Sequence, residues 1–185
     1  MKFLYNFLYI SLIVLLIASC KDEDPVIENP EELITTLNFI LSPQGGGQTV
    51  TFSFQDLDGD GGNAPVITNG TLTANTSYSG TIELLNEAVN PAEDITTEVN
   101  AEDTEHQLFY QTGGLPLTIN YDDQDAIGLP LGLQTTVISG AAGAGTLTIT
   151  LRHEPVKSAA GVAEGQIANA GGETDVEVTF DVVIQ

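Results

Sequence analysis

Hydrophobic and polar residues alternate along most of the chain after residue 33. The clearest run is 176–184, where valine, phenylalanine and isoleucine stand at the even positions. Runs with the same period occur at 37–41, 50–54, 82–84, 117–121, 133–137 and 147–151. A period of two is typical of antiparallel strands that place one face on a core and the other in solvent. With two weaker segments at 65–72 and 106–111, the pattern predicts about eight or nine strands.

The segments between these runs are rich in glycine, proline, aspartate and asparagine, which are turn-forming residues. One segment, 90–106, predicts a short helix, with Asn90 as its cap and Ile95 and Val99 on one face. A domain formed by residues 33–185 is long enough to bury one core. We therefore expect an all-β fold: an antiparallel two-sheet sandwich with Ig-like or Greek-key connections and one short helix.

Residues 1–19 have the pattern of a secretory signal peptide, with Lys2 followed by an apolar run from about residue 7 to residue 18. This run is shorter than the roughly 20 apolar residues of a transmembrane helix. It ends in Ile17-Ala18-Ser19-Cys20, which resembles the lipobox of bacterial lipoproteins, where the chain is cut before a cysteine that becomes lipidated. We expect Cys20 to carry a lipid anchor; the alternative is an ordinary signal peptide with an incidental cysteine.

Residues 20–32 predict a flexible acidic tether, because they contain many acids, two prolines and few large apolar residues. Their start, Cys20-Lys21-Asp22-Glu23-Asp24, resembles the export signal of Bacteroidetes lipoproteins that reach the outer face of the outer membrane. We therefore expect a lipoprotein anchored in the outer membrane and displayed at the cell surface. A periplasm-facing position is the alternative.

The formal net charge is −22, from 4 lysines and arginines against 26 aspartates and glutamates. Such a surface repels nucleic acid and anionic lipid headgroups. We expect no nucleic-acid partner, and we expect membrane attachment through acyl chains on Cys20 alone. The charge also makes divalent cations natural counterions.

Five segments of the domain carry a family resemblance: DLDGDGGNAPVIT, EDITTEVNAEDTEHQLFY, GLPLGLQTT, GTLTITLRHEPVK and AGGETDVEVTF. They resemble a group of small flavobacterial outer-membrane lipoproteins of unknown function. Members are often labelled type 1 periplasmic binding fold superfamily proteins, which implies two α/β lobes and a solute-binding role. Such lobes need near-continuous apolar strands separated by long helices, so we expect the label to be wrong about the fold.

Three aspartates at alternate positions, Asp56, Asp58 and Asp60, follow the run at 50–54 and precede a glycine. This spacing matches the first half of an EF-hand calcium loop. The twelfth position, where that loop needs a glutamate, is Ile67, so the segment is not an EF-hand. Two interpretations stay open: a calcium site completed by ligands from elsewhere, and a solvated acidic turn. Magnesium or another use is a lesser alternative.

A second acidic turn, Asp122-Asp123-Gln124-Asp125, follows the run at 117–121. If it lies at the same end of the sandwich as the first loop, the two could complete one oxygen shell. Asp123 and Asp125 are therefore weaker calcium candidates.

Arg152 and Lys157 are the only cations between residues 33 and 185. They could bind an anionic ligand, although ion pairing with nearby acids is the simpler interpretation. His106 and His153 have no His or Cys neighbour at the spacing of zinc ligands, so the sequence predicts no zinc site.

The chain lacks the motifs of serine hydrolases, zinc proteases and phosphate-binding loops. It also lacks tryptophan, and most phenylalanines and tyrosines of the domain fall at core-facing positions of the predicted strands. Tyr78, Phe109 and Tyr110 remain as the rings that could form a carbohydrate platform. We expect a protein that is not an enzyme: a binding or structural module that contacts another envelope protein or an extracellular ligand. The alternatives are an envelope hydrolase that uses loop carboxylates and the solute-binding role of the family label.

Overall fold

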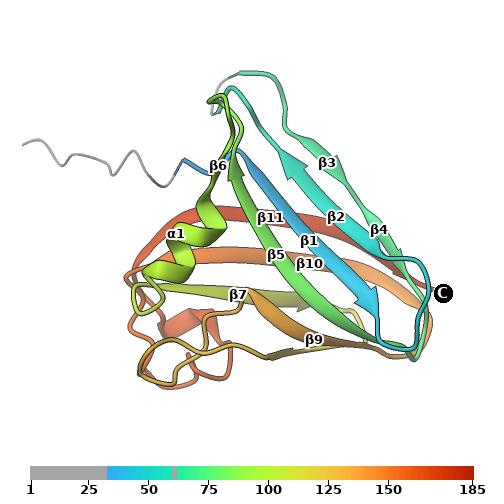
Figure 1. The fold of residues 1–185 in the computed structure, drawn as a ribbon. Helices are drawn as coiled ribbons and strands as arrows, with labels where there is room; N and C mark the ends of the chain where they lie inside the picture. The colour runs from blue at the N-terminus through green and yellow to red at the C-terminus, as the bar shows by residue number, and fades with distance from the viewer. Residues whose placement is uncertain (1–32, 60–61) are drawn as a thin grey trace, which may run out of the picture.

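Two β-sheets packed face to face make up residues 33–59 and 62–185, the part of the chain that the computed structural model describes (Figure 1). The expected all-β sandwich with one short helix is confirmed. The signal peptide, Cys20 and the acidic tether lie outside the described residues, as does Asp60. The described residues contain no α/β lobe, since their one α-helix is seven residues long.

The first sheet has seven strands in the order β3-β2-β1-β5-β9-β8, with the short β6 paired to the end of β5. Its strands are β1 (Thr36–Pro43), β2 (Val50–Gln55), β3 (Val66–Thr68), β5 (Ser77–Asn86), β6 (Glu93–Asp94), β8 (Leu117–Tyr121) and β9 (Gln134–Ser139). The second sheet has the order β4-β11-β10-β7. Its strands are β4 (Gly70–Leu72), β7 (His106–Gly113), β10 (Gly143–His153) and β11 (Glu173–Ile184). All pairings are antiparallel except that of β4 with β11. The helix α1 (Ile95–Ala101) and the 3-10 helix η2 (Ile167–Asn169) complete the fold.

Consecutive strands lie in different sheets at five points of the described chain, and two of these crossings connect an edge strand of one sheet to an edge strand of the other, one on each side of the sandwich. The chain passes from β3, at one edge of the first sheet, through Asn69 into β4, at an edge of the second. On the other side it passes from β7 through Leu115 into β8. Strands that switch sheets form the corners of such sandwiches. The strand predicted at 65–72 is therefore two short strands, one in each sheet.

The alternating apolar residues of both sheets fill the space between them. Phe39 and Phe52 of the first sheet and Phe180 of the second are fully buried there. The ring centroids of Phe52 and Phe180 are 5.6 Å apart, which brings the two sheets into direct contact. Fully burying one side chain of this kind contributes roughly 1.5–3 kcal/mol, so this core is the main source of stability.

The segment that connects β10 to β11, here named the outer loop (residues 154–172), covers the outer face of the second sheet. Phe109 of β7 points to this face, because Leu108 before it belongs to the inner core. It is fully buried and packs with Val162 and Ala170 of the outer loop. A second, smaller core therefore fixes the outer loop to β7.

The helix α1 begins later than the sequence indicates. Glu93 and Asp94 first pair with the end of β5 as β6, so Asn90 is not the cap. Instead the carboxylate of Asp94 accepts hydrogen bonds from the backbone nitrogen (3.3 Å) and the hydroxyl (2.8 Å) of Thr97. Ile95 and Val99 are buried, as expected. In residues 33–59 and 62–185, no helix is long and apolar enough to cross a membrane.

Candidate functional site

The two histidines of the chain lie opposite each other at one end of the second sheet. β7 begins at His106 and β10 ends at His153, and the antiparallel register pairs these two residues directly. Both are on the inner face, because Leu108 and Leu151, two positions away along each strand, belong to the inner core. Directly opposed residues have Cβ atoms about 4.5–5.5 Å apart, so strand pairing alone brings the imidazoles together.

Asp175 joins the histidines because β11 carries a bulge at this point. The register changes from Leu151 opposite Val176 to Arg152 opposite Thr174, which makes Asp175 an extra residue in its strand. In a regular strand Asp175 would point away from the core that takes Val176. The bulge turns it toward the histidines, and only 7% of its side chain is exposed.

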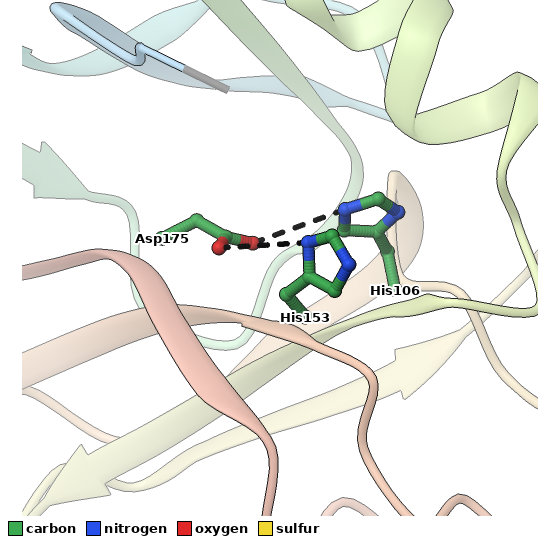
Figure 2. A group of neighbouring side chains, drawn as sticks. All are labelled: His106, His153 and Asp175. Atoms are coloured by element: carbon green, nitrogen blue, oxygen red, sulfur yellow. Dashed lines mark ion pairs between the residues drawn. The ribbon is translucent and has the colours of Figure 1, made fainter. Parts of the chain in front are cut away.

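The three side chains converge on one point (Figure 2). Oδ2 of Asp175 lies 3.9 Å from Nε2 of His106, and Oδ1 lies 4.0 Å from Nδ1 of His153. The two imidazole centroids are 4.8 Å apart, with the ring planes at 64°. One ligand atom from each residue lies within 4.8 Å of the others. Two imidazole nitrogens and a carboxylate form a donor set that suits a transition-metal ion.

A hydrogen bond orients the ring of His106. Its Nδ1 lies 3.2 Å from the carbonyl oxygen of Glu102, directly after α1. Because a carbonyl oxygen only accepts, Nδ1 carries the hydrogen and donates it. In the neutral ring, the nitrogen without a hydrogen is then Nε2, which faces Asp175.

The cluster is largely closed to solvent. The His106 side chain is 1% exposed and that of His153 is 22% exposed, so water reaches the cluster on the side of His153. The exposed acids Glu105 and Glu154 flank this side and form a second group with His153, whose ligand atoms also lie within 4.8 Å of one another. The opening is therefore acidic.

The expectation of no zinc site missed this cluster. It rested on neighbours in the sequence, whereas the three residues meet through the pairing of β7, β10 and β11. β7 and β10 are not consecutive strands, so their pairing is not readable from a turn between them. If the alternation of 176–184 is extended back by one residue, it predicts that Asp175 lies on the outer face, away from the histidines.

In the described residues, the first acidic loop is a hydrogen-bonded turn. Oδ1 of Asp56 accepts from the backbone nitrogen of Gly59 (2.9 Å). Oδ2 of Asp58 accepts from the backbone nitrogen (3.0 Å) and the side-chain amide (2.6 Å) of Asn63. These bonds from Asn63 lower the pKa of Asp58. With Asp60 outside the described residues, calcium binding at this loop stays a prediction.

The second acidic turn cannot complete an oxygen shell with the first. β2 and β8 run in the same direction, so both turns leave toward the same end of the first sheet, but the register places Tyr121 level with Val50, the start of β2, and not with its end. Between them lie β1, β5 and β9, which at about 4.8 Å per strand separates them by about 19 Å. Asp123 also has both oxygens engaged, by the backbone nitrogens of Gly132 (2.7 Å) and Gln134 (2.9 Å). The described residues therefore do not support a shell shared by the two turns.

Asp125, the other weaker calcium candidate, forms a buried ion pair with Lys157. Nζ of Lys157 lies 2.9 Å from Oδ2, and the two side chains are 4% and 0% exposed. Nζ also donates to the carbonyl oxygen of Asp103 (2.6 Å). Burial acts to raise the pKa of Asp125, but the hydrogen bonds from Lys157 and two backbone N–H groups outweigh it and lower the pKa. Both residues are therefore part of the internal structure, as ion pairing predicts for Lys157.

Arg152 lies on the outer side of β10 and is partly exposed. Its Nη1 donates a long hydrogen bond of 3.4 Å to the carbonyl oxygen of Gly172 in the outer loop. This contact holds the end of the outer loop, and anion binding by Arg152 stays a prediction.

A polar pocket of about 520 Å³ lies at the opposite end of the sandwich from the histidines. It is lined by the turn between β1 and β2 and by residues around β4, including Gln48, Thr49, Asn69 and Thr71. No Asp, Glu, His, Lys or Arg occurs among the described residues that line it. The hydroxyl of Tyr78, another lining residue, accepts a hydrogen bond from the backbone nitrogen of Thr73 (2.8 Å). The pocket therefore offers neutral hydrogen-bonding groups.

No aromatic side chain in residues 33–59 and 62–185 is exposed as a platform. Tyr78 and Phe109 are buried, and Tyr110 is partly buried with its hydroxyl donating to the carbonyl oxygen of Gly132 (2.5 Å). Carbohydrate recognition by a flat exposed ring is not supported by the described residues.

The chain matches no known protein family, no curated protein and no solved structure. The resemblance to flavobacterial lipoproteins therefore stays a prediction, and function is argued from the residues.

The buried ion pair predicts a large asymmetry between the two cations. Replacing Lys157 by methionine leaves the Asp125 carboxylate buried without its partner, and should lower the free energy of unfolding by about 3–5 kcal/mol. Arg152→Met, the matched control on the surface, should cost less than about 1 kcal/mol. Urea unfolding at pH 7 measures both. An equal cost for the two variants would contradict the assignment.

The same ion pair predicts a pH dependence. The pKa of Asp125 is lower in the folded than in the unfolded chain. Its stabilisation is therefore fully present above the unfolded pKa of about 3.9 and is lost as the pH falls through the folded pKa. Unfolding curves recorded from pH 7 down to pH 2 measure this effect. The free energy of unfolding should fall less over this range in the double variant Lys157→Met/Asp125→Asn than in the wild type.

The calcium hypothesis for Asp56, Asp58 and Asp60 predicts that calcium raises the thermal midpoint of unfolding, because a ligand of the folded state alone stabilises it. The measurement is thermal melting of the purified protein in calcium and in chelator. Asp58→Ala should remove the shift, and Asp181→Asn, an exposed acid on β11, should keep it. Equal wild-type midpoints under both conditions end the hypothesis.

Proposed function

We propose that this protein is a lipid-anchored outer-membrane lipoprotein whose sandwich serves as a non-catalytic binding module, with the polar pocket as its ligand site. The lipobox-like sequence ending at Cys20 supports the anchor. The observation that carries the binding role is the position and chemistry of the pocket.

The pocket lies at the far end of the sandwich from the point where the described chain begins. The chain enters at Leu33 beside the start of β1, at the end that carries α1 (Figure 1). The pocket is formed at the other end, by the turn that follows Pro43. β1 has eight residues and spans about 26 Å between these ends. A chain anchored through Cys20 would thus present the pocket away from the membrane.

The lining favours a neutral polar ligand. Threonine hydroxyls and the amides of Gln48 and Asn69 both donate and accept hydrogen bonds. A volume of about 520 Å³ falls within the range of small-molecule sites, roughly 300–1,000 Å³. The lining also holds no charged side chain that would pair with an ionic ligand, which again favours a neutral one.

The hydrolase alternative finds less support. General acid and base catalysis by carboxylates needs acids within hydrogen-bond reach of a bound substrate. The described lining of the pocket contains none. The histidine cluster holds an acid, but its most exposed member, His153, is only 22% exposed, which leaves little room for a polymeric substrate.

The anchor predicts a clear result for Cys20→Ser. Without the thiol that is acylated, the protein should incorporate no radiolabelled palmitate and should leave the membrane fraction. Ser19→Ala, which keeps a small residue before the cysteine, should be labelled like the wild type. Palmitate incorporation into Cys20→Ser would refute this anchor.

The orientation is tested with single cysteines, since acylated Cys20 leaves no other thiol in the chain. Thr71→Cys places a fluorophore at the pocket, and Thr104→Cys places one in the exposed turn after α1. In vesicles with an energy acceptor on the lipid headgroups, the label at 104 should transfer more energy than the label at 71. Equal transfer, or more from position 71, would contradict the outward-facing pocket.

The same Thr71→Cys variant distinguishes the two faces of the outer membrane. On intact cells, a membrane-impermeant maleimide should label it if the lipoprotein is displayed at the surface. Labelling only after the outer membrane is permeabilised would support the periplasm-facing alternative.

A further inference from the structure

We propose that His106, His153 and Asp175 bind one transition-metal ion of the zinc class. The site lies at the opposite end of the sandwich from the pocket, is formed by β7, β10 and β11, and is independent of the binding role proposed above.

The donor atoms select the class of ion. Calcium and magnesium prefer six or more oxygen ligands, whereas imidazole nitrogens with one carboxylate suit zinc and its neighbours in the first transition series. Three protein ligands leave a fourth position of a tetrahedral zinc ion open. The exposed carboxylates of Glu105 and Glu154 flank His153, and either carboxylate or a water can fill that position.

The distances fit an ion better than direct contact. Hydrogen bonds to oxygen span about 2.7–3.2 Å, so the separations of 3.9 and 4.0 Å from Asp175 to the two imidazoles exceed that range. Zinc bonds of about 2.0–2.2 Å place two tetrahedral ligands about 3.3–3.4 Å apart. The two Asp175–imidazole separations therefore have to close by about 0.6 Å, and the donor atoms of the two histidines already lie within 4.8 Å of each other.

The ring of His106 has the orientation that a ligand needs. Nδ1 donates to the carbonyl oxygen of Glu102, and the lone pair of Nε2 then points at the same place as the Asp175 carboxylate. Metal-bound histidines almost always donate their other ring N–H to a carbonyl or carboxylate in this way. α1 thus supplies the outer support of the site.

The donor charges also suit a divalent cation. Imidazoles bind a metal in their neutral form, so the ion would meet one carboxylate and two neutral nitrogens. Bound there, it would link three strands at their ends. We therefore expect metal binding to stabilise the fold as well.

The test uses the mature lipoprotein in detergent, stripped with chelator and titrated with zinc chloride by calorimetry, then with cobalt(II) by visible absorption. We expect one ion per chain, and a cobalt spectrum of a four-coordinate site that excess calcium does not remove. His153→Gln and Asp175→Asn should each weaken zinc affinity more than about tenfold. Loss of a residue that only supports a metal ligand typically costs about 10–100-fold, and loss of a ligand itself should cost at least as much. Acylation removes the Cys20 thiol as a competing ligand.

The matched control is Asp181→Asn, which removes an exposed acid from the same strand, β11, and should bind zinc like the wild type. Circular dichroism checks that each variant is folded. If Asp175→Asn does not fold, the result for His153→Gln decides the test, because His153 is partly exposed. Zinc affinity unchanged in His153→Gln, or lowered equally in Asp181→Asn, would show adsorption to the acidic surface and overturn the proposal. Absence of binding to the wild type would also overturn it.

Discussion

The antiparallel register of β7 against β10 determines both faces of the second sheet at once. Leu108 faces the inner core while Phe109 faces the outer loop, and each is fully buried on its own side. A slip by one residue would exchange these two side chains and expose an apolar face. The same register places His106 opposite His153 and leads the chain from α1 directly into the cluster. Core packing on two sides therefore positions the candidate metal ligands.

The buried ion pair of Lys157 and Asp125 supports this end of the molecule from outside. Lys157 belongs to the outer loop, Asp125 to the turn after β8, and Asp103, whose carbonyl Lys157 also contacts, to the turn after α1. One ammonium group thus joins three segments that meet around the start of β7. Such a pair adds little net stability over a packed apolar contact, but it strongly disfavours arrangements that leave either charge buried and alone. The ion pair therefore favours the one arrangement of these three segments in which both charges are paired.

The strands were predictable because one face of each is buried, so hydrophobic residues stand at every second position of the strand. The start of α1 was not, because pairing of β6 with β5 overrides the capping preference of Asn90. The calcium candidates Asp123 and Asp125 follow from spacing alone, and sheet order separates them from Asp56 and Asp58. The histidine cluster depends on a pairing of non-consecutive strands and on a bulge at Asp175, neither of which leaves a local pattern.

The two ends of the sandwich thus differ in chemistry: a neutral pocket at one end and a nitrogen and carboxylate cluster at the other. The central claim about the histidine end is that backbone geometry orients the ring of His106 for the proposed metal ion. Long-range nitrogen–proton NMR correlations of the imidazole rings test it without any substitution. The account predicts a hydrogen on Nδ1 of His106 in the metal-free protein, and a zinc-induced shift of Nε2. A hydrogen on Nε2 alone, unchanged by zinc, would contradict it.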